Sequence, residues 1–219
     1  MHGRRVGGIA GPLSSGVLLA LGAAPAPAQV RLELEPAVGV YAGLGSFDRP
    51  LTQPFSFPEA LSQRTAVALG GQATAWFGAR AGVRLTLFIA ASELGPESRD
   101  LLNRRPIPAR VTVAGLEALV PLRSVSGGGR VFVAGGAALV RRSGRAYEGY
   151  EGTKDLGATL GLGSQFRLTD HLSLQGDARA LLYSLHLTDP AGVEYDSAFQ
   201  TDLLAHVGLV LSLPPQVED

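Results

Sequence analysis

The sequence predicts an all-β fold, namely an eight-stranded antiparallel up-and-down transmembrane β-barrel. In eight separate segments, apolar side chains alternate with polar or small ones, which is the period of a β-strand. The connections between these segments alternate between short and long. After residue 28, no apolar run approaches the roughly 20 residues of a membrane-spanning helix. A mature chain embedded in a membrane must therefore cross it as a closed barrel.

Residues 1–28 have the three-part layout of a secretory signal peptide. Two arginines precede the uncharged segment 6–24, and Ala26-Pro27-Ala28 fits the small-x-small pattern of a signal-peptidase site. We expect cleavage before Gln29, which leaves residues 29–219 as one barrel domain. A retained transmembrane anchor is the alternative, but glycine, proline and serine interrupt the apolar segment.

The first four expected strands place apolar side chains on one face and polar or small ones on the other. In the first, Val30, Leu32 and Leu34 share one face. The fourth strand is the least regular, because Val111 and Val113 share the face of Glu117, which leaves a bulge or another register open. These strands are expected around 30–44, 67–77, 83–90 and 110–122.

The last four expected strands alternate more regularly. The sixth is the clearest example, since its apolar face carries leucine and alanine while its other face is rich in glycine. In the eighth, Leu203 and Val207 oppose Asp202 and His206. These four strands are expected around 131–139, 155–167, 172–183 and 202–213.

The lengths of the connections predict an orientation. Short connections are expected at 78–80, 123–129 and 168–171, and long ones at 46–63, 93–108, 143–152 and 187–198. Short turns at one end and long loops at the other are typical of transmembrane barrels, with the long loops outside the cell. An even number of strands brings the C-terminal end of the barrel to the same, periplasmic side as its first strand.

The composition of the polar face favours a membrane barrel. The alternative is a soluble, lipocalin-like cup with an apolar interior and a charged exterior. Here the polar face is mostly glycine, alanine, threonine and glutamine, and only 17% of all residues are charged, below the rough 25% of soluble domains. Such a face suits the crowded lumen of an eight-stranded barrel, and the apolar face suits lipid.

Isolated charges on the polar face predict a network inside the lumen. An arginine facing lipid at the midplane costs roughly 2–4 kcal/mol, and an acid somewhat less, so pairing inside is favoured. The functional interpretation of this network is a gate or a proton-linked channel. Structural filling is favoured, because eight strands leave little lumen. We expect a core of Arg84, Glu117, Asp177 and Arg179, with His206, Gln72 and Tyr41 as neighbours.

The final strand carries the most specific motif. The segment 206–213 reads His-Val-Gly-Leu-Val-Leu-Ser-Leu, and the segment 166–174 reads as a tight hairpin. On these motifs the mature chain resembles the OmpA-type and OmpW-like outer-membrane barrels. The resemblance implies location in the bacterial outer membrane and an assembly signal, read by the barrel-assembly machinery. Leu213 stands where the families have an aromatic residue, and Pro214–Asp219 follow it. The implied signal residues are His206, Gly208, Leu211 and Leu213.

The sequence gives little support for catalysis or for bound cofactors. Ser184 and His186 stand two apart, with Asp189 or Glu194 nearby, and resemble the Ser and His of lipid A deacylases in reversed order. We interpret them as polar residues at an interfacial strand end. The acidic cluster at 189–196 lacks the ligand spacing of a calcium site. We expect no enzyme activity, no metal and no cofactor.

The expected partners are membrane components. A net charge of zero gives no basis for binding nucleic acid. Arginines at the outer rim could pair with lipopolysaccharide phosphates or simply solubilise the loops, namely Arg104, Arg105, Arg110, Arg141 and Arg142. We predict a monomeric barrel with a largely plugged lumen and a structural or surface-interaction role. A narrow channel for small or hydrophobic solutes is the alternative, followed by a lipid A-modifying enzyme.

Overall fold

The computed structural model describes residues 30–47, 61–96, 106–125, 129–188 and 194–213, together with 190 and 192. The expected signal peptide at 1–28 lies outside the described residues, and so does most of the long connection at 46–63. The acidic cluster also falls outside, because Asp189 is not described and the side chains at 194–198 are not described.

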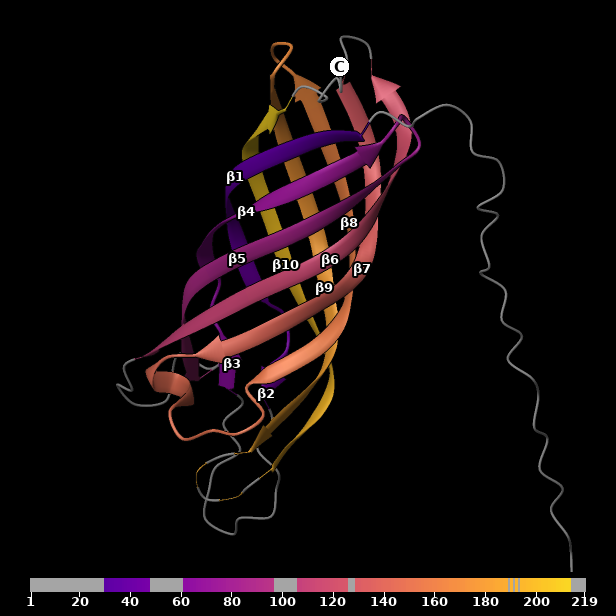
Figure 1. Ribbon diagram of the computed structural model, residues 1–219. Helices are drawn as coiled ribbons and strands as arrows, with labels where there is room; N and C mark the ends of the chain where they lie inside the picture. Colours follow the sequence, from indigo (N-terminus) through magenta and orange to yellow (C-terminus); the bar gives the residue numbers. More distant parts are fainter. Residues whose placement is uncertain are drawn as a thin grey trace, which may run out of the picture.

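Eight long antiparallel strands close into a barrel, which confirms the predicted fold class (Figure 1). Each strand pairs with its neighbour along the chain, and the first pairs with the last. The strands of the barrel are β1 (Val30–Gly43), β4 (Ala66–Phe77), β5 (Ala81–Pro96), β6 (Ile107–Val125), β7 (Gly129–Ser143), β8 (Lys154–Arg167), β9 (Leu172–Thr188) and β10 (Glu194–Ser212).

The two ends of the barrel differ. One end, here called the turn end, carries the connections 78–80, 126–128 and 168–171, and β10 finishes there beside the start of β1. The opposite loop end carries the short strands β2 (Ser46–Phe47) and β3 (Leu61–Gln63) and the 3-10 helix η1 (Arg145–Tyr147). The described residues contain no helix with the length and apolar content needed to cross a membrane.

Several strands extend farther toward the loop end than the alternation predicts. β5 continues to Pro96, whereas the sequence indicates a strand only to about residue 90, and β6 and β10 each have 19 residues. A transmembrane strand needs only about 9–11 residues, so these strands continue beyond a bilayer. Outside the lipid their outer face need not be apolar, which is why the alternation fades there.

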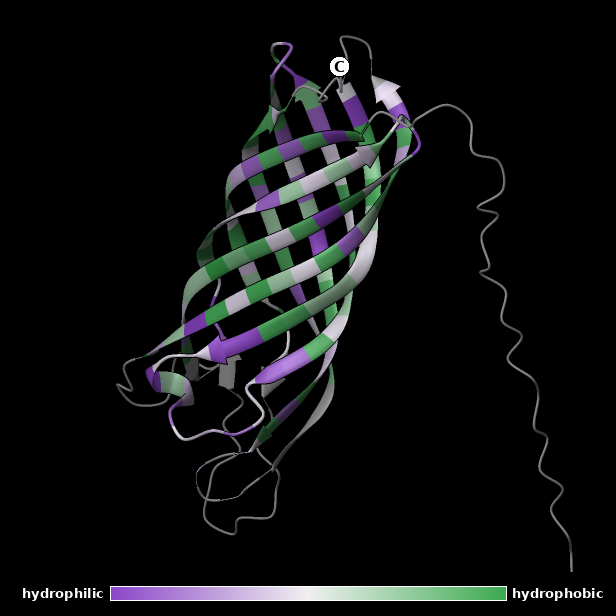
Figure 2. Cartoon of the chain, viewed as in Figure 1, coloured by the Kyte–Doolittle hydropathy of each residue, from purple (hydrophilic) through white to green (hydrophobic). Residues whose placement is uncertain are grey.

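The outer surface is apolar and the lumen polar, because exposed hydrophobic side chains alternate with buried polar ones along the strands. Figure 2 shows the alternation as green segments interrupted by white and purple ones. Outward leucines are widely exposed, for example Leu85 at 59% and Leu156 at 75%. The charged side chains of the middle strands are instead buried in the lumen, including Arg84 and Glu117. This arrangement is the reverse of the soluble cup and suits a barrel surrounded by lipid.

The irregular fourth strand has a simple explanation. The register between β5 and β6 is continuous from Leu94–Ile107 to Gly82–Leu119, so Glu117, Val113 and Val111 all face the lumen. The only register shift in β6 lies farther along, between Pro121 and Arg123 against β7. The apolar pair is inward because the lumen holds an apolar layer at that depth, not because the strand contains a bulge there.

Candidate functional site in the barrel lumen

Four charged side chains form a closed ring of ion pairs in the middle of the lumen. Arg84 donates to Glu117 at 2.8 Å and to Asp177 at 2.9 Å. Arg179 donates to the same two carboxylates, at 3.1 Å and 2.9 Å. Their side chains are 0–1% exposed, and two positive charges meet two negative ones. We call these four residues the central network, and the structure brings together all four residues that the sequence nominated as its core.

The strand register places the charges of the central network. Arg84 on β5 lies directly opposite Glu117 on β6, so the two side chains meet as a cross-strand pair. Asp177 on β9 lies opposite His206 on β10. On β8, Gly163 lies opposite Asp177 and leaves space for the ring of Phe132, since a Cβ there would come within 2.3 Å of that ring.

A hydrogen-bonded chain extends the central network across to β1. Arg179 donates to Gln72 at 3.3 Å, and the Gln72 amide donates to Glu35 at 3.2 Å and contacts the His206 ring. His206 also lies 3.4 Å from Glu35. Gln72 and His206 are therefore neighbours of the network, as the sequence suggested. Glu35 also belongs to this chain, although it is not among the residues that the sequence predicts for the network.

Tyr41 belongs to a different cluster, and this corrects its expected place as a neighbour of the central network. Its hydroxyl and that of Tyr183 both donate to Asp202, while Arg142 pairs with Asp155 and donates to Tyr183. These five buried residues, here called the loop-end cluster, lie farther along the strands toward the loop end. Arg142 was expected among the arginines at the outer rim, but it is 2% exposed inside the lumen.

Tyr147 in η1 lies over the loop-end cluster. It is buried, and its hydroxyl donates to Gln63 of β3 at 2.7 Å. Burial raises the pKa of this phenol well above its usual range, so it remains a neutral donor. The helix and the short strand β3 thereby contribute side chains to the loop end of the lumen.

Apolar layers separate the polar ones. Between the two polar clusters, Phe88 packs against the His206 ring with centroids 4.9 Å apart and shares a buried apolar cluster with Val111, Leu181 and Leu204. On the turn-end side of the central network, Trp76 and Phe132 meet edge to face at 6.1 Å, and Arg84 lies 5.6 Å from the Phe132 ring centroid. Aromatic and aliphatic side chains thus fill the lumen on both sides of the central network.

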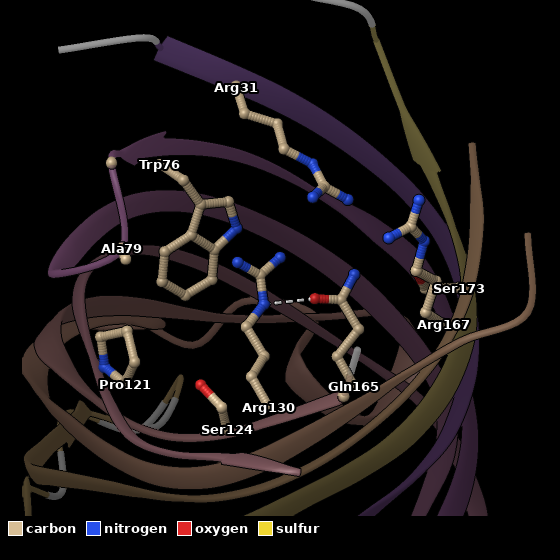
Figure 3. Close-up of a pocket in the computed structure, with 11 residues that line it drawn as sticks. Arg31, Trp76, Ala79, Pro121, Ser124, Arg130, Gln165, Arg167 and Ser173 are labelled. Atoms are coloured by element: carbon tan, nitrogen blue, oxygen red, sulfur yellow. Dashed lines mark hydrogen bonds between the residues drawn. The ribbon is translucent and has the colours of Figure 1, made fainter. Parts of the chain in front are cut away.

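A cavity of about 320 Å³ opens at the turn end (Figure 3). Arg31, Arg130 and Arg167 line it, together with Trp76 and Gln165. Arg130 lies over the Trp76 ring, 3.8 Å from its centroid. Trp76 lines the cavity and contacts Phe132, which lies on the side of the central network. We call this space the turn-end cavity.

The residues of the expected assembly signal fall on both faces of β10. His206 and Gly208 point into the lumen, whereas Leu211 and Leu213 are exposed on the outer face. A Cβ on Gly208 would come within 2.4 Å of Glu35, so this glycine leaves space for the buried carboxylate. The glycine thus has a packing role, whatever reads the signal.

The residues that resemble a catalytic arrangement do not assemble into one in the described part of the chain. Ser184 and His186 lie on the outer face of β9 and are both exposed. The His186 backbone N–H, not its ring, contacts an acid, donating to Asp155 at 3.3 Å. Among the described residues, no cluster of histidine and acidic side chains is suited to hold a metal ion.

Comparison with known proteins identifies the architecture. The outer membrane protein OprG from Pseudomonas aeruginosa superposes with a TM-score of 0.61 at 12% identity, covering 84% of this chain and 95% of OprG. The chain has the fold of an outer-membrane barrel. The structure of outer membrane protein AlkL in lipid bilayers agrees, with a TM-score of 0.63 at 14% identity over 94% of this chain and all of AlkL. No protein-family model matches the sequence, and no curated protein is similar to it in sequence.

Proposed function

We propose that this protein is a non-conducting outer-membrane barrel with a structural and surface-interaction role. The observation that carries the proposal is the closed ring of the central network, whose four side chains are 0–1% exposed. Buried charges that satisfy one another in this way are costly to separate. A water path would require that separation, because the ring spans β5, β6 and β9 and is packed by Phe88 and Phe132 on either side.

The proposal includes a location and an orientation. The exported chain loses residues 1–28, its turn end faces the periplasm, and its loop end faces the cell exterior, as the loop lengths indicate. We expect the protein in the outer-membrane fraction, with a gel mobility that changes on boiling in SDS. A soluble protein with unchanged mobility would contradict the location.

Solute flux through proteoliposomes tests the sealed lumen against the alternative of a narrow channel. We expect wild-type proteoliposomes to swell no faster in glycine or arabinose than empty liposomes. A variant with smaller side chains in both aromatic layers, Phe88→Ala with Phe132→Ala, opens space next to the network and serves as the positive comparison. Swelling by the wild-type protein at a porin-like rate would favour the channel.

The surface role rests on a row of basic side chains on the lipid face, here called the basic row. Arg110, Arg141 and Lys154 are exposed at the loop end of neighbouring strands. Arg141 and Lys154 lie directly opposite each other, and like charges in that position repel. The next outward pair toward the turn end is apolar, Leu139 with Leu156, so the row marks the edge of the lipid-facing band. Phosphates of outer-leaflet lipopolysaccharide would offset the repulsion.

Binding of phosphorylated lipid tests the basic row. We expect Arg141→Gln with Lys154→Gln to reduce retention of bisphosphorylated lipid A, measured by native mass spectrometry, about tenfold relative to wild type. Arg123→Gln, an exposed arginine at the turn end, is the matched control. Equal retention by the double variant and the control would remove the basic row as the lipid site.

Biogenesis is the last part of the proposal. We infer that the barrel-assembly machinery reads the final strand and that the folded protein is a monomer. Leu211→Ser with Leu213→Ser should reduce the folded amount in membranes, because both side chains lie on the outer face. Val207→Ser on the same face is the matched control, and an equal loss in both variants would argue against a specific signal.

A further inference from the structure

The turn-end cavity holds more positive than negative charge. Arg31 and Arg130 share one carboxylate, Glu33, with Arg31 at 3.1 Å. Trp76 also donates to Glu33, at 2.9 Å. The third arginine, Arg167, contacts only Asp170 among the described carboxylates, and Asp170 lies on the exposed turn. Three guanidinium groups therefore meet two carboxylates.

The geometry of the cavity suits an incoming carboxylate. Figure 3 shows the guanidinium groups of Arg31, Arg130 and Arg167 directed toward the same open space, with the Gln165 side chain beside them. Each guanidinium has five N–H donors in a planar fork, and the contacts within the protein use only part of them. Such forks match the two oxygens of a carboxylate, and charge-assisted hydrogen bonds of this kind are strong.

The chain leaves the barrel next to this cavity. β10 ends at Ser212, and the Ser212 hydroxyl accepts a hydrogen bond from Arg31. The following segment 214–219 reads Pro-Pro-Gln-Val-Glu-Asp, with two carboxylates and no basic residue. Its two prolines lack the N–H groups that would extend strand pairing. Six extended residues reach roughly 20 Å, enough to turn back over the cavity mouth.

We propose that the turn-end cavity is a carboxylate-binding site and that its occupant is the acidic segment 214–219 of the same chain. Glu218 or Asp219 places its carboxylate among Arg31, Arg130 and Arg167 and supplies the missing negative charge. This site is independent of the sealed lumen, because it lies outside the layer of Trp76 and Phe132.

Tryptophan fluorescence reports on the cavity, because Trp76 lines it and is the only tryptophan in the chain. In the refolded full-length protein, we expect Glu218→Gln with Asp219→Asn to shift the Trp76 emission and to increase its quenching by acrylamide at least twofold. Glu148→Gln, an exposed acid at the loop end, is the matched control and should leave both unchanged.

A titration with added peptide tests the carboxylate site independently of the segment proposed to occupy it. The peptide acetyl-Pro-Pro-Gln-Val-Glu-Asp-amide should restore the wild-type emission of the neutralised variant in a saturable manner. Further substitution of Arg167→Gln, which leaves the contacts of Glu33 intact, should raise the half-saturating concentration about tenfold or more. Arg123→Gln should not change it. We expect wild-type protein to respond weakly to the peptide, because its own segment competes.

Two results would overturn the proposal. Unchanged emission in the neutralised variant, combined with a saturable and Arg167-dependent response of wild-type protein to sodium acetate, would overturn the segment as occupant and assign the site to an external carboxylate. The absence of any saturable response to peptide or acetate in both proteins would overturn the carboxylate site itself.

Discussion

The central network and the loop-end cluster bury charge in the same lumen, but they neutralise it in different ways. In the central network, Arg84 and Arg179 each contact both Glu117 and Asp177, so charges balance within one ring. The loop-end cluster has one arginine for two aspartates, and the hydroxyls of two tyrosines complete the set.

The difference shows how one lumen combines two kinds of polar filling. An ion-pair ring depends on every member, because removal of one charge leaves its partners buried and unbalanced. A hydroxyl-rich cluster is more tolerant, since a carboxylate that loses one donor keeps another. The central network should therefore resist opening most strongly, and substitutions in the two regions should differ in their cost.

The largest effect is expected for the central network. Arg84→Met leaves Arg179 as the only arginine paired with Glu117 and Asp177, and should lower the free energy of unfolding by about 3–5 kcal/mol. Urea unfolding in lipid vesicles measures this loss. Arg110→Met on the outer face is the control and should stay within about 0.5 kcal/mol of wild type. A loss below about 1 kcal/mol for Arg84→Met would mean that the ring adds little to stability.

A smaller loss is expected for the only arginine of the loop-end cluster. Arg142→Met should cost about 2–3 kcal/mol in the same unfolding experiment, because Asp155 loses its cation while Asp202 keeps the hydroxyls of Tyr41 and Tyr183. If Arg142→Met proved as costly as Arg84→Met, the distinction between the two regions would fail.

The smallest effect is expected for a single hydroxyl. Tyr41→Phe removes one of two phenol donors to Asp202 and should cost about 1 kcal/mol. Tyr183→Phe should cost more, since that hydroxyl also receives a hydrogen bond from Arg142. Unfolding curves of the two variants, measured side by side, give the comparison, and the reverse order would argue against the described arrangement.

The sequence could predict one region better than the other for a physical reason. Arg84 and Glu117 lie on neighbouring strands, on the polar face, and at a similar number of residues from the turns of those strands. The sequence therefore places both side chains at the same depth in the lumen. The distance of Asp177 and Arg179 from their own turn predicts their depth in the same way. The loop-end cluster lies where the strands leave the lipid, and there the outer face becomes polar. Alternation then no longer separates the faces, and Arg142 between Arg141 and Ser143 reads as a rim residue.

Two other features depend on information that alternation does not contain. The inward position of Val111 and Val113 looked irregular, because a lumen that is polar throughout would exclude them, and only the packed interior reveals the apolar layer around Phe88. The turn-end cavity joins residues from β1, β4, β7 and β8. Its charge excess emerges only when the barrel closes and Glu33 is shared between Arg31 and Arg130.

Ion conductance of the purified protein in planar lipid bilayers tests the sealed lumen most directly. The central network and the aromatic layers on either side predict no stepwise currents from wild-type protein at neutral pH and moderate voltage. Steady, discrete openings from wild-type protein, altered in the Arg84→Met variant, would contradict the sealed lumen and assign the central network to the wall of a conducting path.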